Sequence, residues 1–120
     1  MRDFRQLTIW QEGIKVVKKV YEITRLLPQV ETYGIVSQMK RASISIPSNI
    51  AEGCSRSSEI DFKRFLEIAI GSSFELETQL VLVLELYPSL SKQETNNLIE
   101  NLQMLQKQIN SFITAIKKRI

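Results

Sequence analysis

Residues 33–53 read Tyr-Gly-Ile-Val-Ser-Gln-Met-Lys-Arg-Ala-Ser-Ile-Ser-Ile-Pro-Ser-Asn-Ile-Ala-Glu-Gly, and this stretch decides the fold. Its apolar side chains recur at steps of three and four residues, so they share one face of a helix. These residues are Ile35, Met39, Ala42, Ile46 and Ile50, followed by Gly53. Pro47 removes a backbone donor and crowds the carbonyl of Ser43. We therefore expect a continuous helix over about 31–53 that is bent near Pro47.

Three further segments have helical periodicity. The first runs over about 9–27 and ends before Pro28, the next over about 58–87 before Pro88, and the last from about 92 to the C-terminal region. No segment alternates in the way a strand does. Short connections between helices of this length favour antiparallel neighbours. The sequence predicts an all-α fold: one domain, residues 1–120, forming an antiparallel up-down-up-down four-helix bundle.

The first helix carries two apolar rows, of which one bundle core can bury only one. We take Trp10, Ile14, Val17, Tyr21 and Thr24 as the core row. The other row and the off-stripe apolar residues of the next two helices would then need cover, although scattered apolar side chains on a surface need no explanation. The predicted oligomer interface consists of Ile9, Val16, Ile23, Ile44, Ile68, Phe74, Val81 and Leu82.

Small polar residues border the expected core beside Pro47. Gln38, Ser45 and Asn49 lie along the second helix, and Ser72 and Ser73 interrupt the apolar stripe of the third. Polar groups that pair inside a core can fix the register of two helices. We expect these two clusters to pair across the bundle, which is a structural role and not a ligand site.

The stretch around Pro47 also carries a family resemblance. The segments Tyr33-Gly34-Ile35, Gln38–Ala42 and Ser45–Gly53, flanked by Leu7–Gln11 and Phe65–Ser72, resemble the signature of the 23S rRNA intervening-sequence protein family. Founding members of this bacterial family are encoded within intervening sequences of large-subunit ribosomal RNA genes. The resemblance implies a four-helix bundle that assembles into a ring of five subunits. A distantly related branch serves diversity-generating retroelements as a basic, ring-shaped partner of reverse transcriptase and RNA.

Composition restricts the chemistry that is available. The chain has 120 residues, no histidine and one cysteine, Cys54. A Ser-His or Cys-His pair and the Glu-x-x-His pattern of di-iron bundles are therefore absent, and one cysteine forms neither an intrachain disulfide nor a zinc site. No stretch approaches the roughly 20 apolar residues of a membrane span. We expect a cytoplasmic protein with no catalytic residues, metal, cofactor, membrane contact or small-molecule substrate.

Basic residues provide the remaining indication of function. The net charge is +3, which favours anionic partners only weakly. Phosphate backbones bind such cations through counterion release, without reading the base sequence. The candidate nucleic-acid-binding residues are Lys15, Lys18, Lys19, Lys40, Arg41, Arg56, Lys63 and Arg64. For a single subunit, ordinary solubilising charge or ion pairing with Glu52, Glu59 and Asp61 is the favoured explanation. A ring repeats each patch about its axis, so that the potentials add.

These observations predict a non-enzymatic, ring-forming helical bundle that binds RNA or a ribonucleoprotein through its summed basic surface. The alternative is a protein–protein interaction scaffold with no role in nucleic-acid binding. The two hypotheses differ in whether the chain retains RNA at low salt, and in whether a protein partner remains bound after nuclease treatment.

Overall fold

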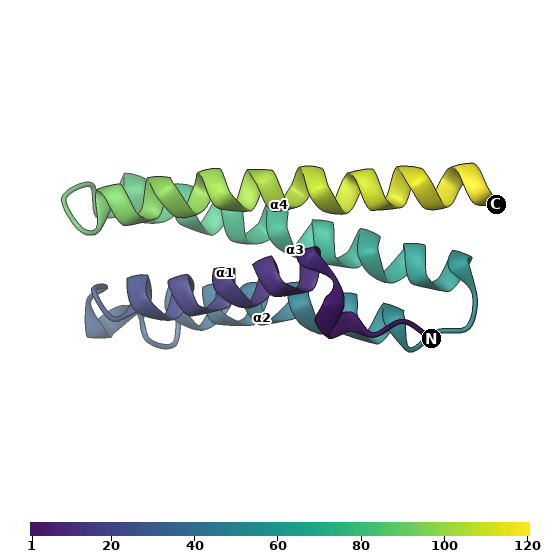
Figure 1. The fold of residues 1–120 in the computed structure, drawn as a ribbon. Coiled ribbons are helices and arrows are strands. Elements are labelled where there is room, and N and C mark those ends of the chain that lie inside the picture. The colour runs from purple at the N-terminus through teal and green to yellow at the C-terminus, as the bar shows by residue number, and fades with distance from the viewer.

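Four long helices make up most of the chain in the computed structural model, which describes residues 1–120. They are α1 (Thr8–Thr24), α2 (Ile35–Cys54), α3 (Glu59–Leu86) and α4 (Lys92–Arg119), with the short 3-10 helices η1 (Phe4–Gln6) before α1 and η2 (Gln29–Glu31) before α2. No strand is present. Successive long helices run in alternating directions (Figure 1), so both termini and the α2–α3 turn lie at one end. The all-helical, four-helix prediction is confirmed.

The four helices form a closed square in cross-section. Each packs against its neighbours in the chain, and α4 also packs against α1, whereas the diagonal pairs α1–α3 and α2–α4 do not approach each other. Two of the predicted boundaries shift. The α-helix α1 ends at Thr24, three residues earlier than predicted, because the backbone then forms a tighter turn in which the Leu27 amide donates to the Thr24 carbonyl. The non-helical backbone of Gly34 delays the start of α2 until Ile35. None of these helices is both long enough and apolar enough to cross a membrane.

The core follows the predicted stripes in α2, α3 and α4 but not in α1. Met39, Phe62, Leu80 and Ile109 are completely buried, as their spacing predicts. In α1 the buried residues are Ile9, Gly13, Val16, Val20, Ile23 and Thr24. Of the predicted core row only Thr24 is buried, so the assignment of the two rows of α1 is wrong.

This exchange of rows removes part of the predicted oligomer interface. Ile9, Val16 and Ile23 are 4%, 3% and 2% exposed within a single chain and cannot present a surface to a partner. The reason lies at Gly13, whose missing side chain lets α1 approach Pro47 of α2: a Cβ on Gly13 would lie 3.3 Å from the Cβ of Pro47. The helix therefore turns its glycine-containing row inward.

Pro47 itself is buried and lies inside α2, which stays helical from Ile35 to Cys54. A bend at Pro47 remains a prediction. Beside it, the Ser45 and Ser72 hydroxyl oxygens are 2.8 Å apart in a hydrogen bond between α2 and α3. The Asn49 side-chain amide donates to the Ser45 carbonyl and hydroxyl oxygens. The predicted pairing between the two helices is thereby confirmed for Ser45 and Ser72. Gln38 is instead exposed, and the Ser73 hydroxyl donates to the Ile70 carbonyl of its own helix.

The remaining predicted interface residues are exposed in the single chain. Phe74 is 58% exposed, and the others, Ile44, Ile68, Val81 and Leu82, are between 42% and 45% exposed. All except Ile44 lie on α3. These apolar side chains are not covered by the bundle: Ile44 lies beside α1, and Phe74 and Val81 lie on the side of α3 toward α4. The outer side of α4 is mostly polar.

Candidate nucleic-acid interface

The end of the bundle that holds both termini is rich in cations. The antiparallel topology brings together η1, the α2–α3 turn, the start of α3 and the last turn of α4 (Figure 1). Half of the chain's 16 Lys and Arg residues gather there: Arg2, Arg5, Arg56, Lys63, Arg64, Lys117, Lys118 and Arg119. The carboxylates at this end are fewer: Asp3, Glu52, Glu59, Asp61 and Glu67, which pairs with Lys63. We call the eight cations the basic end.

Glu59 joins three segments at this end. One carboxylate oxygen accepts a hydrogen bond from the Arg2 guanidinium, and the other accepts from Arg119 Nε at 3.2 Å and Nη2 at 2.6 Å. The hydrogen bonds from Arg119 and Arg2 hold the pKa of Glu59 below its ordinary value. Arg2 also lies over the ring of Phe62, 4.1 Å from its centroid. Two cations are thus fixed by one carboxylate, which leaves excess positive charge at this position.

Phe65 lies beneath two cations, one after the end of α2 and one near the start of α3. The guanidinium carbons of Arg56 and Arg64 lie 4.9 Å and 5.8 Å from the centre of its ring, within the range of cation–π attraction. Arg56 also binds Glu52 at 3.0 Å, but Arg64 has no ion-pair partner. The structure therefore holds two of the predicted residues against a common aromatic support.

Lys63, the neighbour of Arg64, projects from another side of α3. Its ammonium group lies 3.6 Å from the Glu67 carboxylate one turn later. Successive residues on a helix point about 100° apart, so Lys63 and Arg64 cannot act on the same contact.

Lys40 and Arg41 belong to a different part of the surface. Lys40 lies in α2 with its ammonium group 4.6 Å from the centre of the Tyr21 ring in α1. Arg41 is exposed. Both are several turns away from the basic end, so the structure does not combine them with Arg56 and Arg64.

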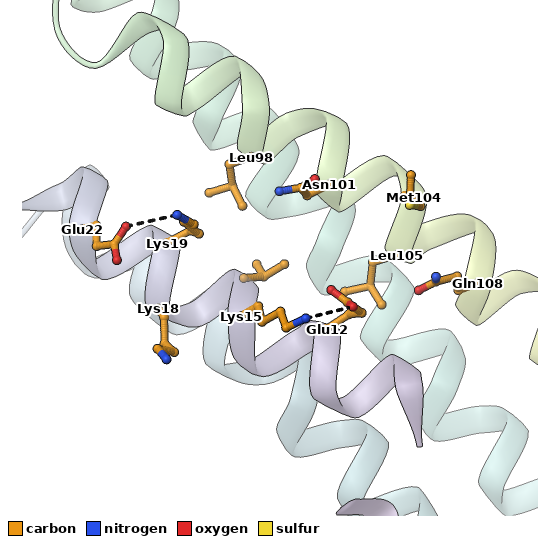
Figure 2. Close-up of a pocket in the computed structure, with 11 residues that line it drawn as sticks. Glu12, Lys15, Lys18, Lys19, Glu22, Leu98, Asn101, Met104, Leu105 and Gln108 are labelled. Carbon is orange, nitrogen blue, oxygen red and sulfur yellow. Dashed lines mark hydrogen bonds and ion pairs between the residues drawn. The ribbon is translucent and has the colours of Figure 1, made fainter. Parts of the chain in front are cut away.

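The three lysines of α1 border a groove of about 450 Å³ between α1 and α4 (Figure 2). Lys15 pairs with Glu12 at 3.4 Å, and Lys19 with Glu22 at 3.6 Å. The Lys18 ammonium group points away from α4 (Figure 2). Because two of the three lysines are paired with glutamates, the groove presents little free positive charge to a phosphate backbone.

The predicted cations are therefore divided among separate surfaces, and sequence reasoning missed the rest of the basic end. Arg2, Arg5, Lys117, Lys118 and Arg119 join Arg56 and Arg64 only through the topology. The cluster Lys117-Lys118-Arg119 suits the C-terminus of a helix. That role alone explains the cluster in the sequence, so its contribution to the basic end was not predicted. An antiparallel bundle places the end of its last helix beside the α2–α3 turn, and this relationship would have predicted the grouping.

The structure brings together no set of side chains typical of a metal site. No group of three or more His, Cys, Asp or Glu residues could hold a metal ion. The Cys54 thiol is buried in the core. Burial raises the pKa of this thiol, although the nearby Arg2 opposes the effect. A buried, protonated thiol is a poor nucleophile.

Comparison with known proteins agrees with the fold. Residues 5–111 match the family described as 23S rRNA-intervening sequence protein. No curated protein matches the sequence. Among solved structures, the chain is similar to a Bacteroides thetaiotaomicron VPI-5482 protein of unknown function from the S23 ribosomal protein family, with 21% identity and a TM-score of 0.78. The match covers 88% of this chain and 98% of that one; at this identity it supports the fold alone.

Proposed function

Because the chain belongs to the 23S rRNA-intervening sequence protein family, we propose that it is a non-enzymatic bundle that assembles into a ring and binds RNA or a ribonucleoprotein. The ring of five copies follows from the family resemblance. The RNA-binding surface is the basic end, and the observation that carries this proposal is the gathering there of half of the chain's 16 Lys and Arg residues.

Assembly and charge support each other in this proposal. Exposed Ile68, Phe74, Val81 and Leu82 give α3 an apolar surface, and covering such a surface stabilises association. A ring whose axis runs along the bundle turns every basic end to the same side. The potentials of the copies then add, so a modest charge on one chain becomes a strongly positive annular face.

The expected mode of binding is contact with phosphates. Arginines and lysines that neutralise phosphates release counterions, which makes the affinity fall steeply as salt rises. Base stacking requires accessible aromatic rings. At the basic end Phe62 is completely buried and Phe65 is buried beneath Arg56 and Arg64, whereas the exposed ring of Tyr33 lies at the other end of the bundle. Binding should therefore depend on salt and vary little with base sequence.

Filter binding of a structured RNA across a salt series tests this function. The variant carries Arg64→Glu with Lys118→Glu, both exposed residues of the basic end. The matched control carries Lys92→Glu with Lys107→Glu, which are exposed elsewhere on α4 and change the net charge equally. We expect affinity to fall on the order of tenfold or more in the variant, because two cations that can neutralise phosphates become anions, and to change little in the control. Failure of the unaltered protein to retain RNA at low salt would remove RNA from the function, and equal losses in both variants would exclude the basic end.

A protein–protein interaction scaffold is the second candidate, because exposed apolar side chains on α3 also suit a protein partner. Recovery of the same bound protein before and after nuclease treatment, together with no RNA retention, would favour it.

A further inference from the structure

Two surfaces of the bundle are suited to each other, because both are apolar and the charged residues beside them have opposite signs. The first lies where α1 and α2 meet on the side away from α3 and α4. A shallow groove of about 290 Å³ runs there, lined by Trp10, Ile14 and Val17 of α1 and by Ile44, Pro47 and Ala51 of α2. We call it the α1/α2 groove. It contains no carboxylate.

Beside this groove lies a group of cations that form no ion pair with a carboxylate. Tyr21 continues the line of groove residues on α1, and Lys40 lies over its ring. Lys18 and Arg25 are three and four residues from Tyr21, so they flank it on the helix surface. Lys18, Arg25, Lys40 and Arg41 have no carboxylate within 4.0 Å. The apolar groove is thus continuous with a positively charged patch.

The second surface is the outward ridge of α3. Ile68 and Leu82 are exposed along it, on the side of α3 toward α2, and a Cβ on Gly71 would meet nothing within 4 Å. A helix or groove from another molecule can therefore approach closely at Gly71. Phe74 points toward α4, where it lies beside Gln103 and Gln106, and is not part of this ridge. We call Ile68, Gly71 and Leu82, with the glutamates beside them, the α3 ridge.

The charge of the α3 ridge is opposite to that of the patch. Glu67, Glu75 and Glu85 are exposed along it. Glu67 pairs with Lys63, whereas Glu75 and Glu85 have no ion-pair partner. A basic apolar surface and an acidic apolar surface on one chain are complementary.

The two surfaces also match in height along the bundle. The Tyr21–Lys40 and Gly13–Pro47 contacts set α1 against α2, and the Ser45–Ser72 hydrogen bond sets α2 against α3. Counting along antiparallel helices from these contacts places Lys18 level with residue 74, within about 1.5 Å of the height of Glu75. By the same count, the α1/α2 groove lies at the height of residues 66–74 of α3.

We propose that copies of this chain associate head to tail, with the α1/α2 groove and its basic patch on one copy against the α3 ridge of the next. Rotation about an axis parallel to the bundle leaves heights unchanged. Apolar residues then meet apolar residues, while Lys18 and Arg25 meet Glu75 and Glu85. This inference rests on the assembly in the proposed function and specifies the two surfaces that make it.

The positions of these surfaces also decide how the assembly closes. The α1/α2 groove and the α3 ridge lie on either side of α2, so they do not face in opposite directions. Unlike surfaces that meet at an angle generate a ring when the rotation closes. In that ring α2 lies toward the axis, and α4 with its polar outer surface lies toward solvent.

Charge reversal with rescue tests the pairing, with mass measured by light scattering. We expect Lys18→Glu with Arg25→Glu to weaken association on the order of tenfold or more, because two ion pairs are lost and like charges then face each other. Glu75→Lys with Glu85→Lys should weaken it similarly. The chain that carries all four changes should assemble again. Rescue supports this pairing, whereas variants that all keep the mass of the unaltered oligomer would overturn it.

Crosslinking provides a second readout in a Cys54→Ala background. Lys18→Cys with Glu75→Cys should give a ladder of covalent oligomers with a short bismaleimide. The control, Lys18→Cys with Lys107→Cys, moves the second thiol to the exposed side of α4 and should give monomer. If the protein is oligomeric but gives no crosslinked ladder, the proposed contact between the α1/α2 groove and the α3 ridge is wrong, although a ring could still form through other surfaces. A monomeric unaltered protein would contradict the ring itself.

Discussion

Gly53 lies so close to α3 that a Cβ added to it would be 2.9 Å from the Cβ of Phe65. The same atom would be 3.0 Å from the Phe62 ring. Neither neighbour is the far end of a flexible side chain, and both are buried. The last turns of α2 can therefore pack on the first turns of α3 only because residue 53 has no side chain.

Gly53→Ala should destabilise the protein in spite of the better helix propensity of alanine. Overpacking of this kind costs typically about 1–3 kcal/mol, against a gain of about 1 kcal/mol from replacing glycine in a helix. Urea denaturation followed by circular dichroism measures the change.

Gly71→Ala is the matched control for Gly53→Ala, because its Cβ would meet nothing within 4 Å. We expect it to stabilise the monomer by about 0.5–1 kcal/mol, measured in the Lys18→Glu, Arg25→Glu background that leaves the α3 ridge free. A Gly53→Ala chain as stable as Gly71→Ala would show that α2 and α3 do not pack as described.

Glu59 should make the stability depend on pH. Its pKa is lowered from the usual 4.5 by hydrogen bonds from Arg119 and Arg2, so its contribution is complete above the unfolded pKa. That contribution disappears as pH falls through the lower folded pKa. Since the carboxylate is about one-third exposed, Glu59→Gln should cost only about 0.5–1 kcal/mol at neutral pH. The difference from the unaltered protein should vanish in acid, and a difference that is constant with pH would contradict the role of the ionised carboxylate.

Cys54 should react slowly while the protein is folded. Its side chain is 1% exposed and its thiol pKa is raised by burial, so both access and the thiolate population are low. Alkylation by iodoacetamide at neutral pH should accelerate by at least about tenfold on unfolding in urea. Equal rates in the folded and unfolded protein would place the thiol at the surface.

The sequence predicted the helices and most of the core because the stripes of α2, α3 and α4 each have one dominant apolar side. It failed in α1, which has two rows of similar length. Gly13 weakened the true row, since glycine adds nothing to an apolar pattern. The polar residues Gln11, Lys18, Glu22 and Arg25 point directly away from Gly13 and Val20, so the centre of the polar face would have identified the buried side.

The candidate site was harder to predict because its cations lie far apart in the sequence. Arg56 and Arg64 are close enough in the chain for their grouping to be seen. Arg2 and Arg119 meet only through Glu59, and that contact depends on the alternating directions of the helices. Lys40 and Arg41 are adjacent in the most distinctive stretch, yet the fold separates them from the basic end.

Sedimentation equilibrium of the nuclease-treated protein tests the assembly on which this account depends. One chain has a mass of 13.9 kDa. The exposed α3 ridge and the α1/α2 groove predict a closed oligomer, and five copies would have a mass of about 70 kDa, five times that of one chain. A single species of 13.9 kDa at micromolar concentration would contradict the ring and the head-to-tail contact together.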